Sequence, residues 1–109
     1  MKLIISIVQQ EDMRELLDHL LSKGFKVTKL KSIGGFLEVS NIVLLIAVEN
    51  EKLDEVLSII QEHAHSRERY VETLPFNLIE GISGFSLPVK VTVGGAQVFI
   101  IDIEKYIKY

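Results

Sequence analysis

The sequence predicts an α+β domain in which two strand–helix–strand halves form one antiparallel sheet. Two segments, residues 13–21 and 53–60, carry apolar residues at spacings of three and four, which is typical of amphipathic helices. Strand-like runs that contain β-branched residues lie on both sides of each segment. The predicted order is β-α-β-β-α-β with an added C-terminal β-hairpin, and this order is the ferredoxin-like arrangement.

The chain forms a single domain, 1–109, because 109 residues support one hydrophobic core with little room for a second. The formal net charge of −3 does not attract nucleic acid or an anionic membrane, so any anion site must be local. The absence of cysteine excludes thiolate chemistry and fits a cytoplasmic protein. The longest apolar run, residues 42–48, is far shorter than the roughly 20 residues that cross a bilayer.

The first strand is predicted over Leu3 to Val8, which is rich in β-branched residues. The helix that follows has its apolar residues on one stripe: Met13, Leu16, Leu17, Leu20 and Leu21. Glu11 and Asp12 fall in its first turn, where they compensate the helix dipole, and Gly24 suits a left-handed C-terminal cap. A second strand is predicted over Phe25 to Lys31.

The second half begins with Ile42 to Val48, a continuous apolar run with the length of a buried strand. Asn50 is the predicted N-cap of the next helix, which ends near Ala64. The apolar stripe of that helix consists of Leu53, Val56, Leu57 and Ile60. Residues 67–74 are the next predicted strand, and residues 75–87 form an excursion loop, because they lack a hydrophobic period and contain two glycines.

The C-terminal hairpin is predicted from the segment VKVTVGGAQVFII. Alternate residues from Val89 to Val93 are apolar, and Gly94 and Gly95 can adopt the positive φ of a two-residue turn. Because two helices cover only one face of the sheet, the apolar strands 42–48 and 98–101 need a partner on the other face. Self-association is the simplest way to supply that partner.

The sequence contains no catalytic or metal-binding constellation. His63 and His65 lie at a helix end, where residues two apart point in different directions, and we interpret both, with His19, as exposed polar residues. Paired carboxylates lie in helical first turns, where dipole compensation explains them. No serine has a nucleophile-elbow pattern, and the central strands lack the aromatic residues of an RNA-binding sheet. We therefore predict no enzyme activity, no metal, no cofactor and no nucleic-acid partner.

One segment points to a small-molecule site. Four lysines lead into it without an acidic residue between them: Lys23, Lys26, Lys29 and Lys31. They create a local positive field suited to phosphates. Gly34 and Gly35 allow backbone N–H groups to approach an anion, and Phe36 and Leu37 can pack on a base. The alternative is a solvated strand edge followed by a tight turn.

Five landmarks occur together along the whole chain. They are MKLIISIVQ at the start, TKL followed by GGFL, Asn41 before an apolar strand, SRE at residues 66–68, and PVKVTVGGAQVFIIDIE at residues 88–104. With these landmarks the chain resembles the PII-like cyclic di-AMP receptor family, trimeric relatives of the PII nitrogen-signalling proteins. The resemblance implies a homotrimer that binds cyclic di-AMP in clefts between subunits and signals to a downstream protein.

The resemblance also implies the ligand-binding residues, which are Lys26, Thr28, Gly35, Phe36, Leu37, Asn41 and Phe99. Thr28 and Asn41 are expected to hydrogen-bond the ligand. The backbone of residues 35–37 is expected to meet phosphate or base. The side chains of Phe36, Leu37 and Phe99 are expected to pack on adenine.

Several positions depart from the usual pattern of that family: Lys26, Glu38, Ser40, Ile42, Val43 and Ala47. Lys26 replaces an Arg and cannot reproduce its planar, two-point contact with phosphate. Charged hydrogen bonds are worth roughly 1.5–3 kcal/mol each, so the departures keep two hypotheses open. In the first, cyclic di-AMP or a related nucleotide orders the 32–39 and 75–87 loops. In the second, the protein is a divergent interaction module that has lost cyclic di-AMP binding and contacts a protein through its excursion loop.

Overall fold

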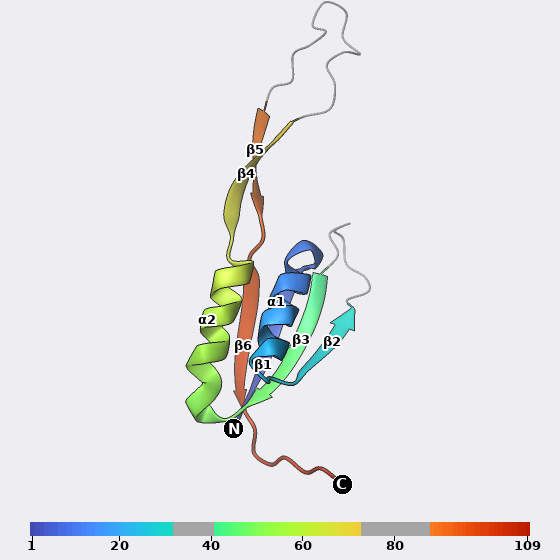
Figure 1. Cartoon of the computed structure of the whole chain (residues 1–109), viewed down its shortest axis with the longest axis vertical. Coiled ribbons are helices and arrows are strands. Elements are labelled where there is room, and N and C mark those ends of the chain that lie inside the picture. Colours follow the sequence, from blue (N-terminus) through green and yellow to red (C-terminus); the bar gives the residue numbers. More distant parts are fainter. Residues whose placement is uncertain (32–40, 73–87) are drawn as a thin grey trace, which may run out of the picture.

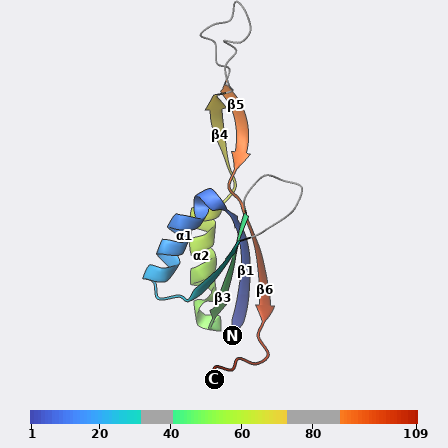
Figure 2. The same ribbon diagram turned by 90° about the vertical axis from the view of Figure 1, so that its right-hand side faces the viewer.

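The computed structural model describes residues 1–31, 41–72 and 88–109. Its elements are β1 (Lys2–Gln9), α1 (Gln10–Ser22), β2 (Val27–Lys31), β3 (Asn41–Val48), η1 (Asn50–Lys52), α2 (Leu53–Ala64), β4 (Arg67–Glu72), β5 (Pro88–Val93) and β6 (Ala96–Asp102). Strands β2, β3, β1 and β6 form, in that order, an antiparallel sheet. Both helices lie on one face of it (Figure 1 and Figure 2). The predicted ferredoxin-like arrangement is confirmed, and we call this unit the α/β body.

The fourth strand of the sheet is β6, so the assignment of residues 67–74 to the body was wrong. Strand β4 pairs instead with β5 in a separate two-stranded sheet, here called the arm, which extends away from the body (Figure 1). The strand beside β1 must supply apolar side chains to the core. Ala96 and Val98 of β6 do so, whereas β4 reads RERYVE and is mainly charged.

The predicted hairpin between β5 and β6 is also wrong, although Gly94 and Gly95 adopt the predicted positive φ of 76° and 99°. The Gly94 amide donates to Gln9 Oε1 at 2.9 Å, and the Gly95 amide donates to the Ala64 carbonyl at 2.8 Å. These bonds hold the two glycines against the ends of β1 and α2. The chain therefore passes from the arm into the body instead of folding back on itself.

Gly24 ends α1 as predicted, with a φ of 87°. Its amide donates to the Leu21 carbonyl and the Phe25 amide donates to the Leu20 carbonyl, both at 3.0 Å, which together form a Schellman motif. Phe25 therefore belongs to the helix cap, and the predicted second strand begins two residues later, at Val27.

The prediction that Asn50 is the N-cap of the second helix is wrong. It is the first residue of η1, a single 3₁₀ turn that leads the chain from β3 into α2. The Lys52 amide donates to the Glu49 carbonyl at 2.9 Å, and no side chain caps the start of η1 or α2. The 3₁₀ turn provides an acceptor for a backbone N–H group. The side chain of an Asn N-cap would otherwise accept a hydrogen bond from such a group.

The hydrophobic core lies between the sheet and the two helices. Alternate residues of β1 and β3 point toward the helices, namely Ile4, Val8, Ile42, Leu44, Ile46 and Val48. The helices contribute Leu16, Leu20, Val56, Ile59, Ile60 and Ala64. Of the predicted stripes, Leu16, Leu20, Val56 and Ile60 are buried in the core and Met13 and Leu53 pack against it, whereas Leu21, at the end of the α1 stripe, remains exposed.

Ser6 is a polar residue inside this core. Its side chain is fully buried on β1, and its Oγ forms no hydrogen bond with any residue in the described ranges. A buried hydroxyl without a partner costs about 1–3 kcal/mol. Ser6 therefore lowers the stability of the fold relative to an apolar residue of the same size.

Replacing Ser6 by Ala should raise the free energy of unfolding by about 1 kcal/mol, because the change removes the unpaired hydroxyl and keeps most of the volume. Urea unfolding followed by circular dichroism measures the shift in midpoint at constant slope. Ser58→Ala, at an exposed position of α2, is the matched control and should change the stability by less than about 0.5 kcal/mol. A clear loss of stability in Ser6→Ala would contradict the prediction.

The other face of the sheet is covered by no helix of the described chain (Figure 2) and is largely apolar. Its side chains come from alternate positions and include Leu3, Ile5, Ile7, Leu30, Val43, Leu45, Phe99 and Ile101. Phe99 and Ile101, on the edge strand β6, are about half exposed. This helix-free face is the surface for which the sequence predicts self-association.

Candidate ligand-binding site

A pocket on the helix-free face contains two of the predicted ligand-binding residues. It has a volume of about 430 Å³ and is lined by Met1, Leu3, Lys26, Thr28, Leu45, Ala47 and Tyr106. Lys26 and Thr28 add an ammonium and a hydroxyl group to a mainly apolar wall, which is the usual composition of a small-molecule site. We call it the Lys26–Thr28 pocket.

Strand register explains why these residues meet. Thr28 lies opposite Leu45 in the β2–β3 ladder, and Leu45 lies opposite Ile5 of β1. Residues two apart on an extended chain share a face, so Lys26 lies on the same side as Thr28 and reaches Ala47. Tyr106, from the segment after β6, completes the wall and was missed because nothing in the sequence relates it to β2.

Asn41 lies in a second pocket, of about 270 Å³, lined by Ile7, Gln9, Asn41, Gly94, Gly95, Ala96 and Gln97. Asn41 and Gln9 are cross-strand partners at the end of the β1–β3 ladder. Asn41 is four residues from Leu45, which is about 13 Å along a strand. The structure therefore does not place Asn41 in the Lys26–Thr28 pocket, although both pockets open on the same face.

Phe99 lies at the opposite edge of the sheet from Thr28. The ladders place Thr28, Leu45, Ile5 and Phe99 in one row, with Thr28 on the edge strand β2 and Phe99 on the edge strand β6. Three strand spacings separate them, which is about 14 Å. Within a single chain, Phe99 therefore cannot pack on a base that Thr28 contacts directly.

The remaining predicted ligand residues, Gly35, Phe36 and Leu37, lie outside the described residues, and so does the predicted excursion loop 75–87. Among the departures from the family pattern, Ile42 is buried in the core and points toward the helices. Val43 lies on the helix-free face, and Ala47 lines the Lys26–Thr28 pocket.

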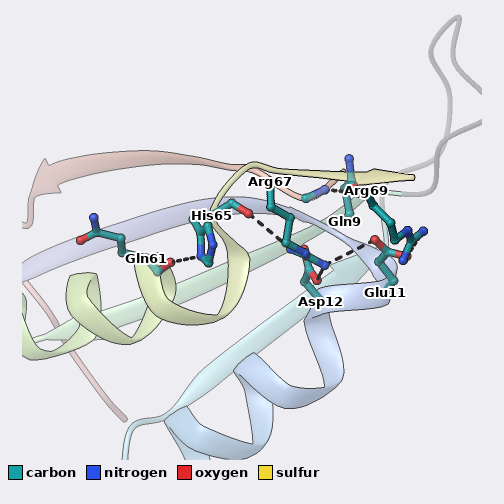
Figure 3. Close-up of polar contacts among 8 residues, drawn as sticks. Gln9, Glu11, Asp12, Gln61, His65, Arg67 and Arg69 are labelled. Atoms are coloured by element: carbon teal, nitrogen blue, oxygen red, sulfur yellow. Dashed lines mark hydrogen bonds and ion pairs between the residues drawn. The ribbon is translucent and has the colours of Figure 1, made fainter. Parts of the chain in front are cut away.

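The structure also joins charged residues that the sequence interpretation did not connect (Figure 3). Arg67, the first residue of β4, donates two hydrogen bonds to the Asp12 carboxylate, Nη2 to Oδ1 at 2.8 Å and Nη1 to Oδ2 at 3.2 Å. Arg67 and Arg69 each lie within 3.7 Å of a Glu11 carboxylate oxygen. The hydrogen bond to Asp12 is the main cause that raises the pKa of Arg67 above its ordinary value.

Asp12 therefore does more than compensate a helix dipole. Its side chain is only 6% exposed, so its charge requires a paired cation. The sequence did contain a signal, because Asp12 lies four residues before Leu16 and eight before Leu20, on the buried side of α1. An acidic residue on a buried stripe predicts a basic partner, but it does not say which one.

Gly94 lies directly beside this ion pair. A Cβ atom there would meet Arg67 Nη1 and would lie 2.7 Å from the His65 carbonyl oxygen and 3.1 Å from Asp12 Oδ2. We call Gln9, Glu11, Asp12, Arg67 and Gly94 the junction cluster, since they connect the arm to the body. Gln9 and Gly94 also line the pocket of Asn41.

The three histidines lie in or directly after the last turns of the two helices. The rings of His19 and His63 lie 4.0 Å apart between their centroids, so His63 packs on its neighbour rather than being simply solvated. No group of three His, Cys, Asp or Glu side chains suited to a metal occurs among residues 1–31, 41–72 and 88–109. Within the same ranges, neither helix is long and apolar enough to span a membrane.

Comparison with known proteins supports the fold described above and identifies the family of the chain. A crystal structure of a functionally unknown protein from Pediococcus pentosaceus superimposes with a TM-score of 0.78 and 34% sequence identity. The match covers 99% of this chain and 96% of that one. The family model described as "Cyclic-di-AMP receptor" matches residues 1–109. With the ferredoxin-like fold and a mainly apolar pocket at Lys26 and Thr28, the chain belongs to the cyclic-di-AMP receptor family.

Proposed function

We propose that the protein binds cyclic di-AMP between the subunits of a cytoplasmic homotrimer and thereby changes a surface that a downstream protein recognises. No bond is broken in this role. Membership of the receptor family supports a nucleotide partner and a signalling function. Lys26 and Thr28 contact the ligand from one copy, and Phe99 packs on an adenine from the neighbouring copy. Asn41 and residues 35–37 complete the contacts.

One observation carries the proposal: Thr28 and Phe99 lie at opposite edges of the same sheet face. A ligand that touches both must lie between two copies. When the β6 edge of one copy meets the β2 edge of the next, the contact is heterologous, and three such contacts can close into a ring. The ring also removes the apolar helix-free face from water.

The junction cluster supports a route from the ligand to the arm. Asn41 neighbours Gln9 in the ladder, and Gln9 Oε1 accepts the hydrogen bond from the Gly94 amide. A ligand that draws the Gln9 amide toward Asn41 weakens this bond, and Gly94 lies at the point where the arm joins the body. The proposed relay is therefore a change in the orientation of the arm relative to the body.

Co-expression of two defective variants tests the shared site. Thr28→Ala and Phe99→Ala should each weaken cyclic di-AMP binding at least about tenfold, since each removes a contact worth about 1.4 kcal/mol or more. In trimers that mix the two variants at random, about a quarter of the sites would combine an intact Thr28 with an intact Phe99. Isothermal titration should then find that fraction of sites with wild-type affinity.

Two controls accompany this experiment. Separately expressed and then mixed trimers that have not exchanged subunits should show no recovery, and sedimentation velocity should give the mass of a trimer for every variant. Absence of recovery in co-expressed trimers would contradict a site between copies. Absence of any heat with cyclic di-AMP for the wild-type protein would favour the divergent interaction module instead.

A further inference from the structure

A second, basic pocket adjoins the Lys26–Thr28 pocket. It has a volume of about 340 Å³ and is lined by Lys23, Gly24, Phe25, Lys26, Ala47, Val48, Glu49 and Lys52. Lys26 and Ala47 line both pockets, so the two pockets adjoin at these residues. We call the second one the lysine pocket.

The lysine pocket concentrates positive charge on an acidic protein. Its three lysines come from three segments, the end of α1, the residue before β2 and the η1 turn, and only Glu49 opposes them. In the described chain, Lys23 and Lys26 have no carboxylate within 4.0 Å. Lys52 lies 3.6 Å from Glu55, an exposed pair that constrains it little. These ammonium groups are therefore available to an anion.

Two backbone amides of the pocket are already satisfied within the chain. The Gly24 and Phe25 amides are already bonded to the Leu21 and Leu20 carbonyls in the Schellman motif. The same bonds satisfy the end of α1, so Lys23 is not needed as a helix cap. The Gly24 and Phe25 amides are consequently not free to bind an anion in this pocket, whereas the lysine ammonium groups are.

We infer that the lysine pocket holds the phosphate groups of the nucleotide, while a base lies in the Lys26–Thr28 pocket against Leu45 and Tyr106. This inference rests on the proposed function, and it assigns roles to Lys23 and Lys52. Three ammonium point charges take the place of the planar two-point contact that a single Lys26 cannot make. Point charges attract phosphate without strict geometry, so affinity depends on charge and on ionic strength.

Charge-neutral variants test the inference by isothermal titration with cyclic di-AMP. Lys23→Gln and Lys52→Gln should each weaken binding about fivefold to tenfold, and the double variant should show a shallower loss of affinity with added NaCl than the wild type. Lys29→Gln is the matched control, because it makes the same change in net charge from an exposed position of β2 that lines neither pocket. It should bind as the wild type does.

If Lys23→Gln and Lys52→Gln bind as tightly as Lys29→Gln, the lysine pocket is not the phosphate site, although the proposed function stands. If the wild-type protein shows no binding of cyclic di-AMP, the proposed function fails. A titration with pyrophosphate then tests whether the lysine pocket binds phosphate groups. Saturable amide shifts at Gly24 and Phe25 in NMR spectra, abolished in the double variant, would support a phosphate site. No saturable shift with pyrophosphate would overturn it.

Discussion

Replacement of Arg67 by Met should lower the free energy of unfolding by about 2–4 kcal/mol. The change leaves the Asp12 carboxylate, which is 6% exposed, without its two hydrogen-bond donors. Loss of one partner of a fully buried ion pair costs about 3–5 kcal/mol. Because the Arg67 side chain is 37% exposed, this pair is only partly buried, and we expect a smaller cost. Chemical unfolding monitored by circular dichroism measures the loss.

Two further variants separate the effect of the buried charge from that of lost packing. Arg69→Met removes an exposed arginine that lies 3.7 Å from Glu11, so it should cost less than about 1 kcal/mol. Asp12→Asn combined with Arg67→Met should be more stable than Arg67→Met alone, because the double variant buries no charge. A similar cost for Arg67→Met and Arg69→Met would contradict this account of the junction cluster.

Replacement of Gly94 by Ala should destabilise the protein by about 2–4 kcal/mol. Part of this cost is the φ of 76°, which an L-residue adopts at a penalty of about 1–2 kcal/mol. The rest comes from the new Cβ atom, which would lie 2.7 Å from the His65 carbonyl and would contact the Arg67 guanidinium. Because a backbone carbonyl cannot easily move aside, the arm would have to shift relative to the body.

Two other glycines provide matched controls for this variant. Gly24 has a φ of 87°, and a methyl group added there would meet no heavy atom within 4 Å, so Gly24→Ala reports backbone strain alone. Gly95 has a φ of 99°, and the nearest contact of an added methyl group is Ser66 Cβ at 3.8 Å. Thermal unfolding should therefore rank Gly94→Ala well below Gly24→Ala and Gly95→Ala in stability. Equal losses at the three positions would show that the junction does not crowd Gly94.

The part of the candidate site that depends on local pattern was predictable from the sequence. Alternation in β2 and β3 places Thr28 and Leu45 on one face, and the lysines before and within β2 indicate a local positive field. Tyr106 and Lys52 were not predictable as neighbours of Lys26. They are far from it in sequence, and their approach depends on how β6 and η1 pack beside β2 and β3.

The sequence by itself determined the features that local physics controls. These are the helix stripes, the buried strands, the Schellman cap at Gly24 and the positive φ at Gly94 and Gly95, since each depends on the conformational preferences or periodicity of neighbouring residues. Only the tertiary structure decided which strand lies beside β1 and which cation pairs with Asp12. Both 67–74 and the segment after Gly95 are predicted as strands, and Arg67 is 55 residues from Asp12, so the outcome depends on the burial that the whole assembled fold achieves.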